Sequence, residues 1–147
     1  MNVDIQLINK NAKIPTQGSE YAAGFDLYAC ADTDNNLIHI LPHTTQKIKT
    51  GIAMSIPDGY FGGIYARSSL ATKQGLRPAN CVGVIDSDYR GEIIVALYND
   101  TNETKTITEG ERIAQLIIQP YLTCSFTSVE KLDKTNRGDG GFGSTGK

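Results

Sequence analysis

Hydrophobic and polar residues alternate along much of this chain with the two-residue period of β-strands. Val3, Ile5 and Leu7 alternate with polar neighbours, and a longer run from Ile48 to Ile56 repeats the pattern. A Pro-Asp-Gly turn signal at 57–59 ends that run. The same pattern predicts strands at 61–66, 92–98 and 112–119, and it predicts a turn within 107–110. The strand at 92–98 is nearly all apolar, which indicates burial on both faces.

One segment favours a helix. Residues 70–74 have helical character, and Gly75 is expected to end the helix after little more than one turn. Many short strands, spaced by roughly 8 to 12 residues, predict an all-β fold. We therefore expect a jelly-roll-like distorted β-barrel with one short helix, formed by residues 1–131, and a mobile Gly-rich C-terminal tail at 132–147.

Composition narrows the classes of function. The 147 residues suit one domain, and 15 glycines with a 39% apolar fraction are typical of many turns. A net charge of −2 without a basic stripe argues against a nucleic-acid polymer as partner. No apolar run approaches the roughly 20 residues that span a bilayer, and the N-terminus does not resemble a signal peptide. We expect a cytoplasmic protein, or a nuclear one if the source is eukaryotic or viral.

The three cysteines, Cys30, Cys81 and Cys124, are widely spaced. They match neither a disulfide framework nor a zinc site, and we interpret them as buried thiols in a reducing compartment. His39 and His43 are four residues apart, but Pro42 lies between them and no glutamate accompanies them. The zinc-protease pattern therefore fails, and both histidines are expected at the surface.

A candidate phosphate site begins at Arg67, which is followed by Ser68 and Ser69. A guanidinium beside two hydroxyls and a helix start suits phosphate oxygens. In the alternative interpretation Ser69 caps the helix and Arg67 forms a surface ion pair. Asp26 lies in a strand that otherwise has the character of a buried one, so its carboxylate needs partners. Either Mg²⁺ reached through water or a structural hydrogen bond would satisfy it.

The tail contains five glycines within residues 137–147 and nearly matches a phosphate-binding P-loop. We reject a P-loop because the required Ser or Thr and the following helix are missing. Glycine-rich backbone can still form an anion-binding nest, Arg137 and Ser144 can add phosphate contacts, and Phe142 is free to stack on a flat ring. A disordered surface tail is the alternative.

Five short motifs, taken together and in order, resemble the trimeric dUTP pyrophosphatase (dUTPase) family over nearly the whole chain. They are residues 23–29 (AGFDLYA), 66–70 (ARSSL), 80–91 (NCVGVIDSDYRG), 110–116 (GERIAQL) and 137–146 (RGDGGFGSTG). The resemblance implies hydrolysis of dUTP to dUMP and pyrophosphate by Mg²⁺-assisted attack of water on the α-phosphate. This reaction would limit uracil in DNA and supply dUMP for dTMP synthesis. It also implies a homotrimer with shared active sites.

The resemblance assigns roles to individual residues. Asp86 is the general base that orients the water, and the Tyr89 ring packs under the deoxyribose. Asp26 holds Mg²⁺ through water. The uracil and phosphate contacts fall on Asn80, Gly83, Val84, Ile85, Arg67, Ser68, Ser69, Gln115, Arg137, Phe142, Gly143 and Ser144, with Phe142 stacking on the base and the tail closing over a neighbouring subunit's site.

The second motif departs from the pattern, because Ser69 stands where many members have glycine. The same letters resemble the dCTP deaminases, so a deaminase or a bifunctional enzyme is one alternative. A catalytically inactive β-sandwich that binds nucleotide or protein is another, and it would be expected to lack Asp26, Asp86 or Arg137, all of which are present.

Overall fold

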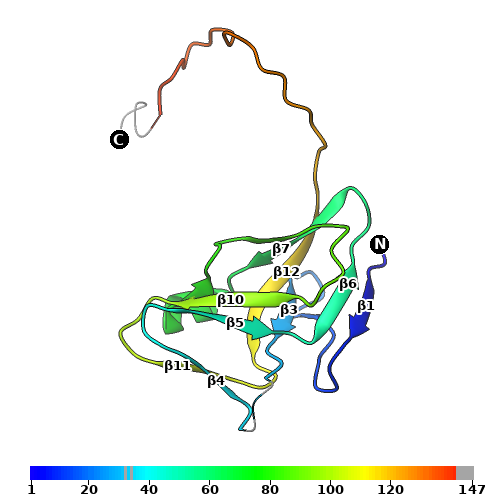
Figure 1. Ribbon diagram of the computed structural model, residues 1–147, viewed down its shortest axis with the longest axis vertical. Coiled ribbons are helices and arrows are strands. Elements are labelled where there is room, and N and C mark those ends of the chain that lie inside the picture. Colours follow the sequence, from blue (N-terminus) through cyan, green and yellow to red (C-terminus); the bar gives the residue numbers. More distant parts are fainter. Residues whose placement is uncertain (32, 34, 142–147) are drawn as a thin grey trace.

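The structure is a computed structural model that describes residues 1–31, 33 and 35–141 (Figure 1). The predicted contacts of Phe142, Gly143 and Ser144 lie outside the described residues. Within the described part the chain forms twelve strands and one short helix. Their bounds are β1 Asp4–Leu7, β2 Thr16–Gln17, β3 Phe25–Tyr28, β4 Leu37–Ile40, β5 Thr45–Lys49, β6 Ile52–Ser55, β7 Tyr60–Tyr65, η1 Leu70–Gln74, β8 Leu76–Pro78, β9 Gly83–Ile85, β10 Ile94–Asn99, β11 Lys105–Thr108 and β12 Arg112–Pro120.

The strands form antiparallel pairs in four small sheets. A five-stranded sheet has the order β2-β3-β12-β7-β9, and a three-stranded sheet has the order β5-β10-β8. Two further pairs, β1 with β6 and β11 with β4, complete the arrangement. Mostly strands with one short helix confirm the predicted all-β class, and this arrangement is compatible with a distorted jelly roll.

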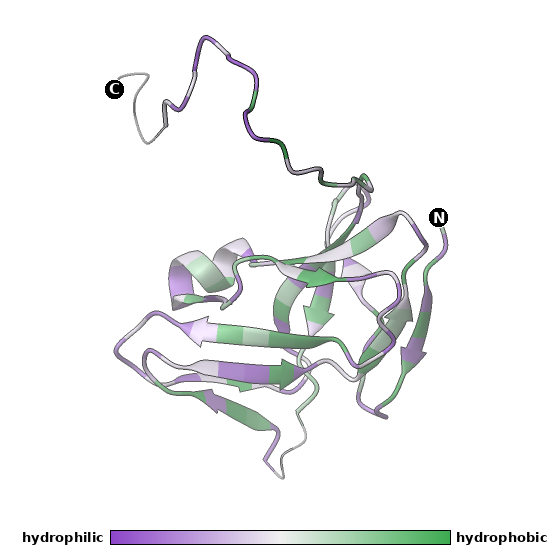
Figure 2. Cartoon of the chain, turned by 45° about the horizontal axis from the view of Figure 1, so that its top comes forward, coloured by the Kyte–Doolittle hydropathy of each residue, from purple (hydrophilic) through white to green (hydrophobic). Residues whose placement is uncertain are grey.

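The core lies between the sheets and consists mainly of branched aliphatic side chains. In Figure 2 hydrophobic and hydrophilic residues follow one another along the strands, as a half-buried strand requires. The side chains that are less than 2% exposed include Leu27, Ile40, Ile48, Ile52, Ile56, Leu76, Ile93, Val95, Leu97, Ile107 and Ile113.

The predicted helix is confirmed at Leu70–Gln74. It is a single turn of π-helix, and Gly75 ends it in the left-handed conformation, with φ of 66°. The Gly75 amide donates to the carbonyl of Leu70. Glycine adopts this conformation without the steric cost that a Cβ would add.

The single strand predicted from Ile48 to Ile56 is wrong, because the chain turns at Gly51 and forms two strands, β5 and β6. Gly51 has a φ of 69°, and a Cβ there would lie 2.7 Å from the Ala12 Cβ. The Thr50 hydroxyl donates to the carbonyl of Ile93, which holds the corner against the core. The alternation of apolar and polar residues did not reveal this break, because Thr50 before Gly51 and Ile52 after it are both buried.

One further strand prediction requires correction. The segment predicted to be buried on both faces is β10, and one face of it is buried: Ile94 is 40% exposed, whereas Val95 and Leu97 are 1% exposed. Within this chain the sheet β5-β10-β8 has one side packed on the core. The turn predicted within 107–110 is confirmed at residues 109–110, directly after β11, in which the fully buried Ile107 pairs with Ile38.

The cysteine prediction is correct for Cys30, which is buried, and wrong for Cys81 and Cys124, which are exposed. Cys81 lies in a surface turn and Cys124 lies beyond the last strand, so neither can reach the core. His39 and His43 are exposed, as predicted. Among the described residues no helix is long and apolar enough to cross a bilayer.

After β12 the chain leaves the body of the molecule (Figure 1). Residues 121–139 are exposed, including Leu122 and Phe126, each 94% exposed. The segment contains no strand or helix up to residue 141.

Candidate active site

One group of predicted site residues surrounds a hollow of about 200 Å³ on the five-stranded sheet. Asp26 comes from β3, Gln115 from β12, and Arg67 and Ser68 from the loop between β7 and η1. Arg112 also borders the hollow, together with Gly18, Ala22 and Gly24. The first, second and fourth sequence motifs therefore meet at one place.

Asp26 is held by two arginines. Its Oδ1 accepts a hydrogen bond from Arg67 Nε at 2.8 Å, and its Oδ2 accepts one from Arg112 Nη1 at 3.2 Å. The residue is 8% exposed, so these ion pairs provide the partners that a buried carboxylate requires. The surface ion pair considered for Arg67 is thus an ion pair with a buried aspartate.

A β-bulge brings Arg112 onto this face. Side chains alternate along a strand, so Arg112 and Gln115, three residues apart, would ordinarily point to opposite faces. The register of β12 against β3 shifts between Arg112 and Ala114, and Gln115 lies opposite Asp26 while Arg112 lies opposite Tyr28. The extra residue restores the common face, as bulges do near functional sites.

The Gln115 side chain contacts both the first and the second motif. Its Nε2 donates to the carbonyl of Ala66 at 2.8 Å, directly before Arg67. Its side chain also lies against Gly24, where a Cβ would be 2.8 Å from Gln115 Oε1 and 3.3 Å from its Cβ. A glycine at position 24 therefore gives Gln115 the room to support the Arg67 loop.

Ser69 does not cap the helix with its side chain, so that alternative is wrong. Its backbone is helical, with φ of −67° and ψ of −37°, and the hydroxyl makes no capping hydrogen bond. The carbonyl of Ser68 accepts from the Thr72 hydroxyl at 2.7 Å. These contacts leave both serine hydroxyls available for a ligand.

A second group of predicted residues lies on the other side of β7, in β9 and in the loop after it. Val84, Ile85, Asp86 and Tyr89 line a hollow of about 180 Å³ with Glu92 and Ile94. Another hollow, of about 300 Å³, lies against Val84 and Asp86 and is walled by Phe61 and Tyr121. Asp86 therefore borders both hollows. No hydrogen bond or ion pair to its carboxylate occurs within the described ranges.

The loop around Asp86 is held by local contacts. The Tyr89 amide donates to the carbonyl of Asp86 at 3.2 Å, and the Tyr89 hydroxyl donates to the carbonyl of Glu92 at 3.1 Å. The Tyr89 ring lies directly over Gly91, where a Cβ would be 2.6 Å from the ring Cζ. Gly91 thus determines where the ring rests.

β9 is an edge strand that pairs with β7 alone, with Gly83 opposite Ile64 and Val84 opposite Gly63. Its backbone groups on the side away from β7 have no strand partner, and such an edge can bond a ligand that carries amide-like groups. The Asn80 side chain lies beside this strand, with its Nδ2 3.2 Å from the position of a Cβ on Gly83. Asn80 and residues 83–85 are therefore together, as predicted.

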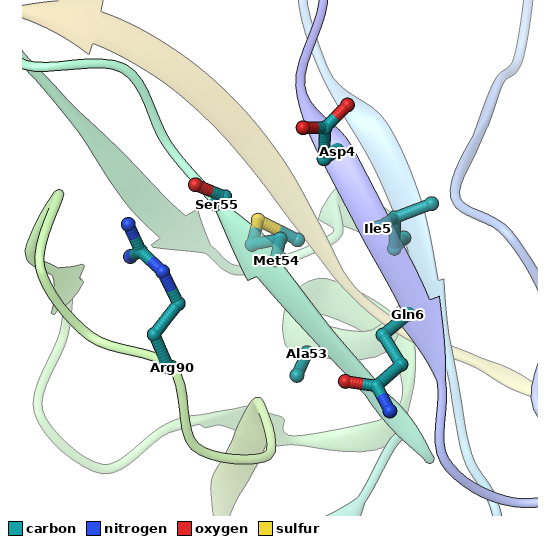
Figure 3. Close-up of a pocket in the computed structure, with 7 residues that line it drawn as sticks. All are labelled: Asp4, Ile5, Gln6, Ala53, Met54, Ser55 and Arg90. Atoms are coloured by element: carbon teal, nitrogen blue, oxygen red, sulfur yellow. The ribbon is translucent and has the colours of Figure 1, made fainter.

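Figure 3 shows a fourth hollow, of about 240 Å³, that lies along β1 and β6 and is bordered by Arg90. Asp4 and Arg90 lie on opposite sides of β6 in this view. Arg90 Nη1 donates to the carbonyls of Ser87 and Tyr89, which stabilises the Asp86 loop from behind. This hollow contains none of the predicted site residues.

The described part of the tail folds on itself. Arg137 Nε donates to the carbonyl of Gly140 at 2.8 Å, and the Gly138 amide donates to Thr135. Arg137 therefore lies in a local turn at 135–140, and these hydrogen bonds do not connect it to either half of the site.

Arg112 belongs to the fourth motif, but its place in the site was not predicted from the sequence. Arg112 lies three residues before Gln115. This spacing places both side chains on one face of the strand only when a bulge lies between them, so the sequence alone did not point to Arg112. Among the described residues no group of three His, Cys, Asp or Glu side chains could hold a metal. The donor set of the first hollow is one carboxylate, which fits Mg²⁺ held through water if phosphate oxygens supply further ligands.

The comparisons agree with this geometry. A family model described as dUTPase matches residues 10–146. The chain is 46% identical over 143 residues to a deoxyuridine 5'-triphosphate nucleotidohydrolase of Finegoldia magna, covering 97% of this chain and 98% of the relative. It is 46% identical to the protein of the same description from Nautilia profundicola, over the full length of both chains.

Solved structures of phage proteins share the fold. The Staphylococcus bacteriophage 80alpha dUTPase with dUPNHPP matches with a TM-score of 0.88 and 29% identity, over 99% of both chains. A mutant dUTPase from phage phi11 of S. aureus, described as revealing the coordination of a structural Mg(II) ion, matches with a TM-score of 0.80 and 25% identity, over 91% of this chain and 100% of that one. The resemblance inferred from the five motifs is confirmed: the chain belongs to the dUTPase family and is an enzyme of this nucleotidohydrolase class.

Proposed function

We propose that the chain hydrolyses dUTP to dUMP and pyrophosphate at sites shared between copies of a homotrimer. One observation carries this proposal: the phosphate-type residues and the nucleoside-type residues are each assembled within the chain, but in separate hollows on either side of β7. The hollow with the phosphate-type residues lacks the nucleoside-type residues, and the other hollow lacks the phosphate-type residues. A neighbouring copy would place one chain's Asp86 loop beside another chain's Arg67 hollow.

Arg67, Ser68, Ser69 and Gln115 are assigned to the phosphates. Arg67 uses its Nε for Asp26 and makes a long contact of 3.5 Å from Nη1 to the carbonyl of Arg112. Much of its planar fork is therefore free for bidentate contact with phosphate oxygens. Phosphoryl chemistry depends mainly on such positioning and on charge stabilisation.

Magnesium, when bound with the nucleotide, would neutralise charge that develops on the phosphates. Asp26 is the residue assigned to hold its water shell. The supporting observation is that Asp26 is the acidic residue lining this hollow, beside residues suited to phosphate.

Asp86 is assigned as the general base. Its carboxylate is exposed and without a protein partner in the described chain, so it can accept a hydrogen bond from water or from a sugar hydroxyl. Asn80 and the free edge of β9 are assigned to uracil, since backbone amides and carbonyls match its alternating polar edge. Tyr89 is assigned to the deoxyribose.

The tail is assigned to the neighbouring subunit's site. Leu122 and Phe126 are almost fully exposed in the single chain, and Val84 and Ile94 on the body are 59% and 40% exposed. Exposed apolar residues of this kind are typical of surfaces that another subunit covers. Arg137, Phe142, Gly143 and Ser144 would then close over bound nucleotide and exclude water.

In the cell, this reaction would limit uracil incorporation into DNA and supply dUMP for dTMP synthesis. A cytoplasmic location, with small-molecule substrate and neither nucleic-acid polymer nor membrane as partner, stays a prediction.

The function is tested by measuring pyrophosphate release from dUTP, dTTP, dCTP and UTP side by side, with ammonia release from dCTP measured in parallel. We expect pyrophosphate from dUTP at a kcat/KM at least about 100-fold above that of the other three, because Asn80 and the β9 edge would select uracil and the Tyr89 ring would exclude the ribose 2′-hydroxyl of UTP. Ammonia from dCTP would show that Ser69 marks a deaminase, and absence of turnover with all four would contradict the proposal.

Replacing Gly91 with alanine tests the role of Tyr89. The new Cβ would displace the ring, which can swing outward because Tyr89 is 43% exposed, so the fold should survive. We expect discrimination of dUTP against UTP, measured as the ratio of kcat/KM values, to fall by about 10-fold. The Tyr89→Phe variant keeps the ring, and we expect it to keep the discrimination. An unchanged ratio in Gly91→Ala would argue against contact between the Tyr89 ring and the sugar.

A further inference from the structure

The two oxygens of the Asp26 carboxylate are held by guanidinium groups of different mobility. The Arg67 contact is short, at 2.8 Å, and its side chain is 20% exposed. The Arg112 contact is longer, at 3.2 Å, and its side chain is 51% exposed. An ion pair with a half-exposed partner is weak and exchanges readily, so the Oδ2 contact is the one that can open.

Arg67 is anchored at several points. Its carbonyl accepts from the Ala71 amide at the start of η1, and Gln115 holds the preceding carbonyl of Ala66. Within the described residues the Arg112 side chain makes no hydrogen bond other than that to Asp26. Its backbone is fixed by the bulge, but its guanidinium can move without breaking another contact.

The charges around the hollow indicate that Arg112 and a bound cation would compete for the Asp26 carboxylate. Two guanidinium groups face one carboxylate, which leaves a positive balance at a place where a hydrated divalent cation would also be positive. A cation there would be repelled by Arg112, and its water shell would bond most easily to Oδ2, the oxygen held by the longer contact. The phosphates of a nucleotide reverse this balance, because they attract both the cation and the arginine.

We infer that Arg112 is a positioning residue that competes with hydrated Mg²⁺ for Oδ2 of Asp26 and gives up this oxygen when nucleotide phosphates arrive. This inference rests on the proposed function and adds to it a role for Arg112 in cation binding. Arg112 keeps Asp26 oriented in the empty site and makes cation binding depend on nucleotide.

The test is calorimetric binding of the imido analogue dUpNHpp at increasing Mg²⁺, with the full-length assembled protein. We expect Arg112→Gln to lower the half-saturating Mg²⁺ concentration by about 3- to 10-fold, the scale of a partly exposed ion pair. Arg112→Lys retains the competing charge and should remain within about 2-fold of the unmodified protein. Arg77→Gln is the matched control, because Arg77 also pairs with an aspartate, Asp100, at 2.7 Å but does not line the hollow.

An unchanged or higher Mg²⁺ requirement in Arg112→Gln would overturn the inference. If this variant does not fold, as judged by circular dichroism and gel filtration, a crystal structure of the unmodified protein with dUpNHpp and Mg²⁺ decides. We expect Arg112 to have left Oδ2 while Arg67 stays on Oδ1, and retention of the Arg112 contact beside a bound cation would overturn the inference. Failure of the unmodified protein to release pyrophosphate from dUTP would instead contradict the proposed function.

Discussion

Replacing Asp86 with asparagine is expected to lower kcat for dUTP by about 10²- to 10⁴-fold, the usual contribution of a general base. An amide keeps the size of the side chain and can still contact a sugar hydroxyl, but it cannot accept the proton of the attacking water. Because the Asp86 carboxylate makes no hydrogen bond or ion pair with the described residues, the variant should remain folded. The measurement is steady-state pyrophosphate release, with binding of dUpNHpp measured separately.

Asp88→Asn provides the matched control for this substitution. Asp88 is two residues away in the same loop, is also exposed, and does not line the hollows that Asp86 borders. We expect Asp88→Asn to retain turnover within about 3-fold, as for other surface changes. If Asp86→Asn retains near-normal kcat, or if the two variants lose activity equally, Asp86 is not the base.

Truncation after Asn136 is expected to lower kcat by about 10²- to 10³-fold, the cost typical of losing charge-stabilising donors and closure. Arg137 and Gly138 hydrogen-bond within the local turn at 135–140, so the core should not be affected. Thermal unfolding and gel filtration should therefore match those of the full-length protein. A fully active truncated protein would show that the tail does not close the site.

Mixing two inactive variants separates sharing of sites from closure within one chain. The truncated protein keeps Asp86, and Asp86→Asn keeps the tail. If Asp86 and the tail in one site come from different copies, mixed trimers should recover activity at roughly a quarter of their sites after subunit exchange. If both come from the same chain, no mixture recovers activity, and a shared site that combines Asp86 with a neighbour's tail is wrong.

Local patterns predicted much of the fold because a half-buried strand needs apolar residues at every second position. Val3 and Ile5 followed this rule, and the strands at 61–66 and 112–119 formed near the predicted bounds although buried residues are adjacent in both. Gly51 did not interrupt the alternation, so the corner between β5 and β6 was hidden. Gly51 has a left-handed backbone, and Ala12, a residue distant in sequence, packs where a Cβ would lie; both features arise only in the folded chain.

Some residues of the site could likewise be predicted from the sequence, and others could not. The motif order identified Arg67, Asp26 and Gln115 because each lies in a distinctive short segment. The bulge at 112–114 was not visible, since two adjacent buried residues, Ile113 and Ala114, resemble ordinary core positions. Arg112 was therefore not recognised as a partner of Asp26.

By itself, the sequence determined the all-β class, the short helix ended by Gly75 and the family. These depend on local periodicity and on residue types in order, which any extended chain displays. The tertiary structure decided which motifs meet. Pairing of β12 with both β3 and β7 brings Asp26, Arg67 and Gln115 together, while β9 carries Asp86 to a separate hollow. Such contacts depend on strand register and on a bulge, which arise only when distant segments pack together.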